Sequence, residues 1–285
     1  MTEENRVFQE GDAIMLIDNA EHRFLMILGK GRSFQSHQGF VNHTDFIGRS
    51  EGDVLYTNKN LPLILLRPSL SEYLITMKRR TQIIYPKDVA LILIMADVHP
   101  NLTVVEAGLG SGSLATSVLR ALAGTGHLTS YEMRPEFREQ AERNIRGLLG
   151  DTPNHTIKDQ DVYLGIEERN VDRVLLDLPE PWRLVDEVAQ ALAPGGIFMT
   201  YLPTVLQVHH VVDEIRKDGR FAMIEVVESL VRPWYVMPQS ARPEHRMVAH
   251  TGFLTFARRF VGFPPEVVTD PTPDVDESSS DALME

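Results

Sequence analysis

The stretch that decides the fold is Val104-Val105-Glu106-Ala107-Gly108-Leu109-Gly110-Ser111-Gly112-Ser113-Leu114. An apolar strand leads directly into three glycines at alternate positions, and the pattern over residues 114–122 is helical. Glycines at the end of a strand let the backbone turn sharply and approach a ligand closely. We therefore expect a ligand-binding loop between this strand and the helix that follows it.

The spacing of these glycines indicates which ligand the loop holds. It is Gly-x-Gly-x-Gly, whereas dehydrogenases that bind a pyrophosphate carry Gly-x-Gly-x-x-Gly. Glu106 directly precedes the turn, and an acidic group beside a short loop suits a zwitterionic amino-acid moiety. The pattern favours S-adenosylmethionine over NAD as the cofactor.

Acidic residues at the ends of the next strands extend this predicted site. Glu132 ends the apolar strand 127–132, where a carboxylate can accept hydrogen bonds from both ribose hydroxyls of a nucleoside. Asp161 lies near the end of a third strand and is assigned to the adenine amino group of the cofactor, with Asp159 as the competing assignment.

Strands and helices alternate after Tyr85, which is typical of a doubly wound parallel sheet. The predicted strands cover residues 103–107, 127–132, 171–177, 196–202, 222–231 and 250–257. The predicted helices cover residues 87–98, 114–122, 135–149, 184–192 and 205–217. The fold class is therefore α/β.

The first part of the chain has a different pattern. Short strands over residues 12–17, 23–28, 53–57 and 63–66 are separated by turn-rich segments. A helix over residues 69–80, with Ser69 as its N-cap, leads into the α/β part. We expect a small β-domain over residues 1–68, the α/β domain with its linking helix over residues 69–262, and a disordered acidic tail over residues 263–285.

The composition excludes several classes of protein. The chain has no cysteine, which excludes a disulfide framework, thiolate metal sites and a cysteine nucleophile. Its apolar runs fall short of the about 18 residues that suggest a membrane span, and its first residues are polar and acidic. A soluble protein of a reducing compartment, with no membrane association, fits these features.

Charge and histidine content do not decide the partner. The net charge of −12 argues against nucleic acid, but residues 261–285 carry seven acidic side chains and no Lys or Arg. The basic stretches Lys78-Arg79-Arg80 and Arg258-Arg259 therefore remain available for docking. The pair His209-His210 has no accompanying Asp or Glu at ligand spacing, so we predict no metal site.

The fourth α/β strand ends in Leu176-Asp177-Leu178-Pro179-Glu180-Pro181-Trp182. Ligands of doubly wound sheets bind outside the carboxyl ends of the strands, so Asp177 would face the reactive end of the cofactor. The alternative is that Asp177 caps the next helix. Trp182 either walls the acceptor pocket or belongs to the core.

Several motifs in order along the chain resemble the tRNA (adenine-N1)-methyltransferase family that modifies position 58 of the T-loop. They are Arg80-Thr81-Gln82-Ile83-Ile84-Tyr85-Pro86-Lys87-Asp88, Glu106-Ala107-Gly108-Leu109-Gly110-Ser111-Gly112, Ser130-Tyr131-Glu132-Met133-Arg134, the Asp177–Trp182 loop and His250-Thr251-Gly252-Phe253-Leu254. The resemblance covers roughly residues 8–260. Leu109 departs from the threonine that the family often has, which removes a hydroxyl from the loop.

The resemblance implies an S-adenosylmethionine-dependent enzyme with a seven-stranded Rossmann-like sheet, cytoplasmic and homotetrameric, acting on tRNA. It implies Asp177 and Tyr85 as catalytic residues. The implied cofactor-binding residues are Gln82, Glu106, Gly108, Gly110, Ser111, Gly112, Ser113, Leu114, Glu132, Asp161 and Asp177. The implied substrate contacts are Trp182, Arg80 and Arg242. Two alternatives remain open: a methyltransferase for a protein or small-molecule acceptor, and a non-catalytic tRNA-binding subunit.

Overall fold

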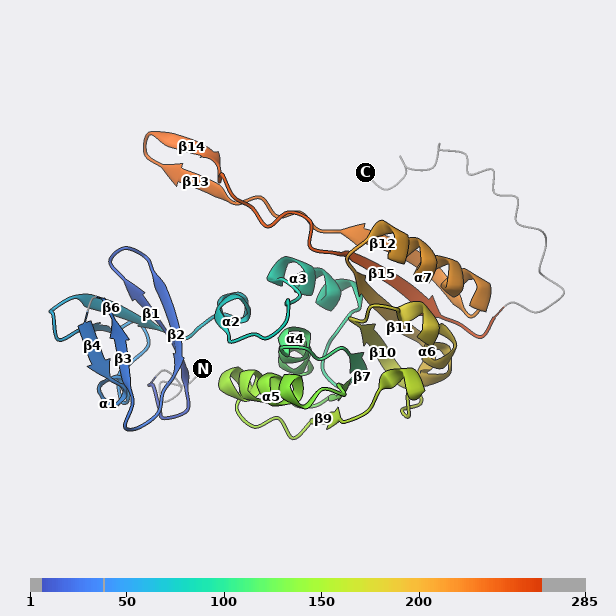
Figure 1. Ribbon diagram of the computed structural model, residues 1–285, viewed down its shortest axis with the longest axis horizontal. Helices are drawn as coiled ribbons and strands as arrows, with labels where there is room; N and C mark the ends of the chain where they lie inside the picture. Colours follow the sequence, from blue (N-terminus) through green and yellow to red (C-terminus); the bar gives the residue numbers. More distant parts are fainter. Residues whose placement is uncertain (1–6, 38, 263–285) are drawn as a thin grey trace.

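The structure is a computed structural model that describes residues 7–37 and 39–262. Its centre is a seven-stranded sheet with strand order β12-β15-β11-β10-β7-β8-β9 (Figure 1). The strands are β7 (Thr103–Ala107), β8 (His127–Tyr131), β9 (His155–Lys158), β10 (Val171–Leu176), β11 (Leu192–Leu202), β12 (Phe221–Glu228) and β15 (Phe253–Arg259). The predicted α/β sheet is therefore present, with the glycine loop at the end of strand β7, next to the central strand β10.

Helices cover both faces of this sheet. One face carries α3 (Pro86–Met95), α4 (Ser113–Leu122) and α5 (Pro135–Leu149), and the other carries α6 (Val185–Ala191) and α7 (Val205–Asp218). Side chains of one strand alternate between the two cores: in β10, Leu175 packs under α3–α5, while Val174 and Leu176 pack under α6 and α7. Because both faces are buried, the second half of β10, Val174–Leu176, is a continuous apolar run.

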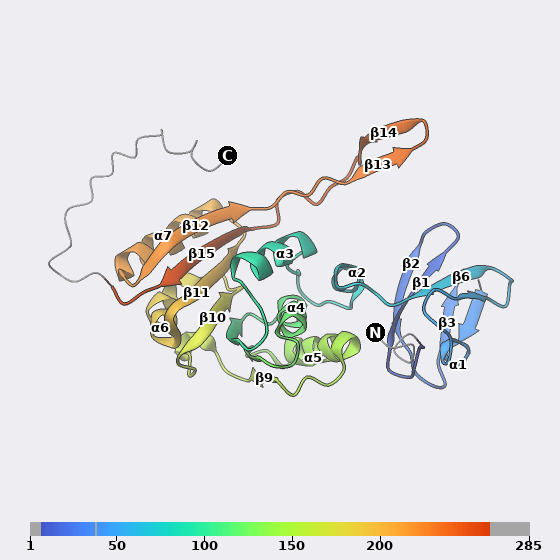
Figure 2. The same ribbon diagram turned by 180° about the vertical axis from the view of Figure 1, so that it is seen from behind.

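The alternation of strands and helices predicted a wholly parallel sheet, and this prediction is wrong for one strand. β15 runs antiparallel to both β11 and β12. The chain returns from β12 to β15 through an extended arm, residues 229–252, and not through a helix, so the neighbouring strand runs in the opposite direction. The arm holds the hairpin β13 (Trp234–Met237) and β14 (Ser240–Pro243) and projects from the molecule (Figures 1 and 2).

The N-terminal region forms a separate β structure beside the sheet (Figure 2). Strands β1 (Ala13–Asp18), β2 (Arg23–Ile27), β5 (Val54–Tyr56) and β6 (Pro62–Leu66) form one antiparallel sheet, and β3 (Ser33–Ser36) pairs with β4 (Gly39–Asn42), followed by α1 (His43–Phe46). This region has its own core, which includes Phe8, Phe46 and Leu63.

A short helix joins the two parts. α2 (Leu70–Thr76) begins at a capping box, in which Ser69 and Glu72 bond each other's backbone N–H groups. The prediction extended this helix to residue 80, but it ends at Thr76, because Met77 does not have helical backbone angles. The chain then runs to the glycine loop, where the Arg80 N–H donates to Ser111 Oγ. The helix therefore ends early because the chain that follows it contributes to the site.

In the part of the chain that the structure describes, no helix is long and apolar enough to cross a membrane. The acidic tail predicted over residues 263–285 lies outside the described residues.

Candidate active site

The glycine loop forms a tight turn at the end of β7. Gly108, Gly110 and Gly112 have φ of +90°, +52° and +80°, a region that favours glycine. A Cβ atom on Gly108 would lie 2.1 Å from the carbonyl oxygen of Asp177, and one on Gly112 would lie 3.1 Å from the Cβ of Ala141 on α5. The loop is thus held against the neighbouring strand end and helix, with its backbone facing the cleft.

Three cavities meet at Asp177. The first, about 230 Å³, lies over the glycine loop and is also lined by Gln82, Ser111, Ser113, Leu114 and Arg134. The second, about 360 Å³, lies toward β8 and is lined by Glu132, Asp161 and Tyr163, among others. The third, about 530 Å³, is lined by Tyr85, Tyr201, Gln207 and Thr251, among others. Residues predicted for the cofactor and for the acceptor are therefore gathered around one carboxylate.

Glu132 lies beneath the glycine loop and is 4% exposed. Its carboxylate accepts from the Gly110 N–H at 3.3 Å and from the Arg134 side chain at 3.0 Å. Arg134 also stacks on Phe137, 3.9 Å from the ring centroid. The sequence analysis gave no role to Arg134, although its position two residues after Glu132 was a signal. A ribose that hydrogen-bonds to Glu132 must therefore displace Arg134 or share the carboxylate with it.

The two competing acids after β9 lie in different places. Asp161 lines the cavity beside Glu132 and caps the short helix η2 (Val162–Leu164), accepting from the Tyr163 N–H at 3.0 Å. Asp159 is not among the residues that line this cavity and forms an ion pair with Arg138. The geometry favours Asp161 for contact with a bound nucleoside.

Glu106 is buried behind the loop, 1% exposed, and does not line the three cavities. Its carboxyl group accepts from the Ser130 hydroxyl at 2.7 Å. Burial raises the pKa of Glu106 to about 8, and the charges of Asp177 and Glu132 add to this effect. Three acidic groups thus lie near one another, an environment that favours a cationic ligand.

Asp177 is half-buried where the three cavities meet, and desolvation there raises its pKa to about 7. Tyr85, the N-cap residue of α3, lines the same acceptor cavity. Perturbed carboxyl groups at the junction of cavities are typical of functional sites.

The predicted RNA contacts lie apart from these cavities. Trp182, in the short helix η3 (Pro181–Leu184), stacks on His210 with ring centroids 4.4 Å apart and does not line the acceptor cavity. Arg80 is exposed beside the glycine loop, and the Arg242 guanidinium lies over Tyr235 in the arm. Among residues 7–37 and 39–262, no group of three His, Asp or Glu side chains is arranged to hold a metal ion.

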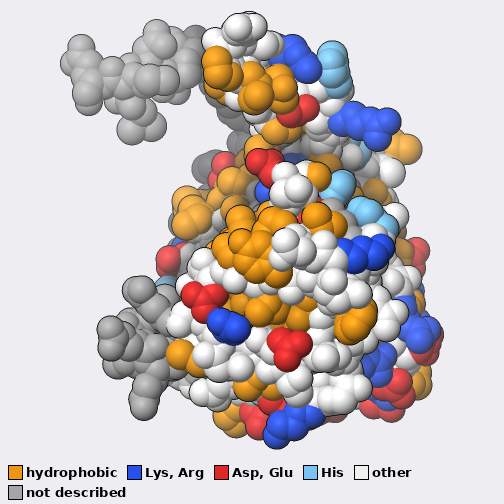
Figure 3. Space-filling view, turned by 90° about the vertical axis from the view of Figure 1, so that its left-hand side faces the viewer, with side chains coloured by type: hydrophobic (Ala, Val, Ile, Leu, Met, Phe, Trp, Pro, Cys, Tyr) orange, Lys and Arg blue, Asp and Glu red, His pale blue; other side chains and the backbone are white. Residues whose placement is uncertain are grey.

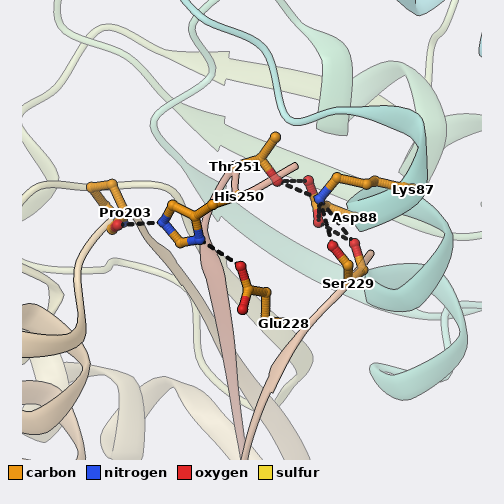
Figure 4. A network of polar contacts seen from close by, with 7 residues as sticks. All are labelled: Lys87, Asp88, Pro203, Glu228, Ser229, His250 and Thr251. Carbon is orange, nitrogen blue, oxygen red and sulfur yellow. Dashed lines mark hydrogen bonds and ion pairs between the residues drawn. The ribbon is translucent and has the colours of Figure 1, made fainter. Parts of the chain in front are cut away.

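The acceptor cavity contains residues that the sequence analysis did not single out. Tyr201 and Pro203 come from the end of β11, Gln207 from α7, and His250 and Thr251 from the end of the arm. Figure 4 shows Pro203, His250 and Thr251 side by side. These residues lie far from Tyr85 in the sequence and on different elements from Asp177, so no local sequence pattern indicated that they share one cavity. The HTGFL motif pointed to the segment but not to its contacts.

Known families match most of the chain. Residues 63–242 match the family described as tRNA methyltransferase complex GCD14 subunit, and residues 7–55 match the TrmI-like N-terminal family. The tRNA (adenine(58)-N(1))-methyltransferase TrmI of Thermus thermophilus is 35% identical over 249 residues, covering 87% of this chain and 96% of the relative. The family resemblance of the motifs is confirmed.

Two solved structures share this architecture. One, described as a SAM-dependent O-methyltransferase from Thermotoga maritima, has a TM-score of 0.86 and 34% identity, covering 92% of this chain and 98% of that one. The other, described as tRNA (m1A58) methyltransferase TrmI from Aquifex aeolicus, has a TM-score of 0.76 and 28% identity, covering 89% and 99%. The predicted methyltransferase sheet with its small N-terminal β region is confirmed.

Proposed function

We propose that this chain, which belongs to the family of tRNA methyltransferase complex GCD14 subunits, methylates N1 of adenine 58 in the T-loop of tRNA. The observation that carries the proposal is the position of Asp177, where the cavities over the glycine loop and beside Glu132 open into a larger acceptor cavity. A cofactor and a base bound in these cavities would meet at this carboxylate.

The residues present fit S-adenosylmethionine, which supplies an electrophilic methyl group on a sulfonium. We assign Gly108 and Gly110, with Ser111, Ser113 and Leu114, to the methionine moiety, and Glu132 and Asp161 to the ribose and adenine. Gly112, which was also predicted to bind the cofactor, does not line these cavities and instead lets the loop pack against α5. Gln82 lines both the cofactor and the acceptor cavities. Glu106 lies behind the loop, where a bound cation would favour the ionised form of its buried carboxyl group.

Asp177 stabilises the charge that develops on the acceptor. Adenine N1 has a free lone pair, so methylation needs alignment more than a base. As N1 becomes methylated, positive charge spreads toward the exocyclic N6. An ionised Asp177 that accepts a hydrogen bond from N6 stabilises this charge more in the transition state than in the ground state.

The acceptor cavity suits an extruded base. N1 lies on the Watson–Crick edge, so the target nucleotide must leave its stack, at a cost of a few kcal/mol. The cavity of about 530 Å³ is lined by Tyr85 and Tyr201. Stacking on an aromatic ring contributes about 1–3 kcal/mol per base, which offsets part of this cost. We assign the stacking to Tyr85 and Tyr201, because Trp182, which was predicted as a substrate contact, does not line this cavity.

Arg80 beside the loop and Arg242 on the arm are proposed phosphate contacts, since both carry charge on accessible segments. With a tRNA substrate and no cysteine in the chain, we place the protein in the cytoplasm.

We further propose a homotetramer. The arm exposes apolar side chains along its length and carries an isolated two-stranded hairpin, which is at best marginally stable alone. They are Leu230, Val231, Trp234, Tyr235, Val236, Met237, Met247 and Val248. Hydrophobic side chains also gather on the end of the molecule formed by the N-terminal region (Figure 3), where Phe40, Val54, Tyr56 and Ile64 are exposed.

The proposed boundaries of the β-domain, the methyltransferase domain and the tail are residues 1–68, 69–262 and 263–285.

A second candidate is O-methylation of another acceptor. The Thermotoga maritima structure is described as an O-methyltransferase, and a carboxyl group with a pKa of about 7, as burial gives Asp177, can remove a proton from a hydroxyl. Adenine 58 is preferred because the motifs after Asp177 and around Tyr85 match the tRNA-modifying family.

The experiment is methyl transfer from labelled S-adenosylmethionine to a tRNA transcript, followed by nucleoside analysis. We expect 1-methyladenosine in the transcript and none when position 58 carries uridine. Label that enters protein or a small metabolite, and not the tRNA, would support the second candidate. RNA binding without transfer would support the non-catalytic subunit.

A further inference from the structure

A buried ion pair lies at the start of α3, immediately after Tyr85 (Figure 4). The side chain of Lys87 is 7% exposed and that of Asp88 is fully buried, with Lys87 Nζ 2.9 Å from Asp88 Oδ1. The proposed chemistry uses neither residue. Their place in the fold therefore needs a separate explanation.

The pair is completed by residues from both ends of the arm. The Ser229 hydroxyl donates to Asp88 Oδ1 at 2.6 Å, and the Thr251 hydroxyl donates to Asp88 Oδ2 at 2.6 Å. Lys87 Nζ donates to the Ser229 carbonyl oxygen at 3.0 Å and to the Thr251 hydroxyl. We call Lys87, Asp88, Ser229 and Thr251 the arm-base network. A buried ion pair is weak evidence for added stability, because desolvation offsets its attraction, so its placement is the more informative feature.

The arm-base network lies between two tyrosine walls of the acceptor cavity. Tyr85 is the N-cap of the helix that carries Lys87 and Asp88. On the other side, the ring of Tyr201 packs on Gly252, where a Cβ atom would lie 2.5 Å from the ring, and its hydroxyl interacts with Thr251. The network thus joins both walls without contributing a charged group to the cavity lining.

A second contact holds the neighbouring residues of the arm. His250 Nδ1 lies 2.7 Å from Glu228 Oε1, and its Nε2 lies 2.8 Å from the Pro203 carbonyl oxygen. Both partners are acceptors, so the protonated ring satisfies both, and the Pro203 and Glu228 contacts raise the pKa of His250. Both ends of the arm are therefore fastened at the rim of the acceptor cavity.

We propose that the arm-base network is a positioning device, which holds Tyr85 and Tyr201 at the separation that aligns the target base with the methyl donor. Lys87, Asp88 and Ser229 lie outside the cavity lining and act through the two tyrosines, whereas Thr251 joins the network and also lines the acceptor cavity. This inference rests on the proposed function, because alignment matters for a step in which geometry supplies much of the rate.

The test compares Thr251→Val with Thr251→Ser. Valine keeps the shape but removes the hydroxyl that joins Asp88, Lys87 and Tyr201, whereas serine keeps the hydroxyl. We expect Thr251→Val to lower the single-turnover rate at saturating tRNA and cofactor by about 10- to 100-fold, as small misalignments do. We expect unchanged affinity for S-adenosylhomocysteine and an unchanged KM for tRNA. Thr251→Ser is expected to restore most of the rate.

Two further variants separate positioning from stability. Ser229→Ala removes one donor to Asp88 from a residue outside the cavity lining, and a smaller loss of rate is expected. Thr57→Val is the matched control, because Thr57 is buried in the N-terminal region and its hydroxyl accepts from the Leu61 N–H. It is expected to lower the melting temperature without lowering the rate.

A wild-type rate in folded Thr251→Val and Ser229→Ala would overturn the inference while leaving the proposed function intact. An equal loss of rate in Thr57→Val would also overturn it. If the wild-type protein places no methyl group on adenine 58, the proposed function fails, and this inference fails with it.

Discussion

Gly108 and Asp177 meet backbone to backbone, since a Cβ atom on Gly108 would lie 2.1 Å from the Asp177 carbonyl oxygen. The contact joins the ends of β7 and β10, which are neighbours in the sheet. It explains why the cavity over the glycine loop and the acceptor cavity share one carboxylate. The cofactor loop and the acceptor strand are built as a single unit.

Replacing Gly108 by alanine is expected to destroy cofactor binding and to destabilise the protein. A side chain at φ of +90° carries strain of about 1–3 kcal/mol, and the added methyl group would displace the Asp177 backbone. Calorimetric titration with S-adenosylhomocysteine and urea unfolding measure the two effects. Gly124→Ala is the control, because Gly124 has φ of +76° but open space around its Cβ position. Wild-type cofactor affinity in Gly108→Ala would contradict the close approach.

Glu132→Ala is expected to weaken S-adenosylhomocysteine binding by about 10- to 100-fold, since a hydrogen bond to a charged group contributes about 1.5–3 kcal/mol. The loss also frees Arg134, which the carboxylate now holds. Asp159→Ala provides the comparison, because that carboxylate pairs with Arg138 and does not line the cavity. Similar dissociation constants for the two variants would remove the ribose assignment.

Local patterns predicted the parts of the site that lie on consecutive elements. The alternate glycines, Glu132 at the end of β8 and Asp177 after β10 needed only strand ends and turn chemistry, because parallel strands bring their carboxyl ends to one edge. The choice between Asp159 and Asp161 needed the structure, since it depends on which side chain faces the cavity.

Contacts across long stretches of chain could not be predicted. Lys87 meets Thr251 from a different part of the sequence, and the apolar run 222–231 gave no sign that β12 ends at Glu228 so that Ser229 can bond Asp88. The sequence did not predict the arm, because the periodicity of apolar residues indicates which side chains are buried, whereas the apolar side chains of the arm are exposed. Trp182 stacks on His210 of α7, a tertiary contact that spacing does not encode.

The rate of methyl transfer is expected to rise with pH. Burial raises the pKa of Asp177 to about 7, and only its ionised form stabilises the charge on the base, so the rate is lost as pH falls through this pKa. A bound sulfonium cation favours the carboxylate and moves the midpoint below that value. Single-turnover rates measured across the pH range with saturating cofactor and tRNA check this. A rate that falls as pH rises would show that a protonated group is required.

Loss of apolar side chains from the arm is expected to dissociate the assembly. Trp234 and Val236 are 59% and 69% exposed in the single chain, so their burial between subunits would favour association. Sedimentation equilibrium should give the mass of the proposed tetramer for the wild-type protein and a lower mass for Trp234→Ser. Ile94→Ser serves as the control, because Ile94 is an exposed apolar residue of α3 outside the arm. A monomeric wild-type protein would refute the assembly.

The most direct measurement of the central claim uses Asp177→Asn, which removes the charge at nearly constant volume. On one preparation, the affinity for S-adenosylhomocysteine and the single-turnover rate of adenine 58 methylation are measured together. The account predicts a rate lower by about 10²–10³-fold, typical of losing one group that stabilises transition-state charge, with cofactor affinity close to that of the wild type. An undiminished rate, or a rate loss matched by an equal loss of cofactor affinity, would contradict it.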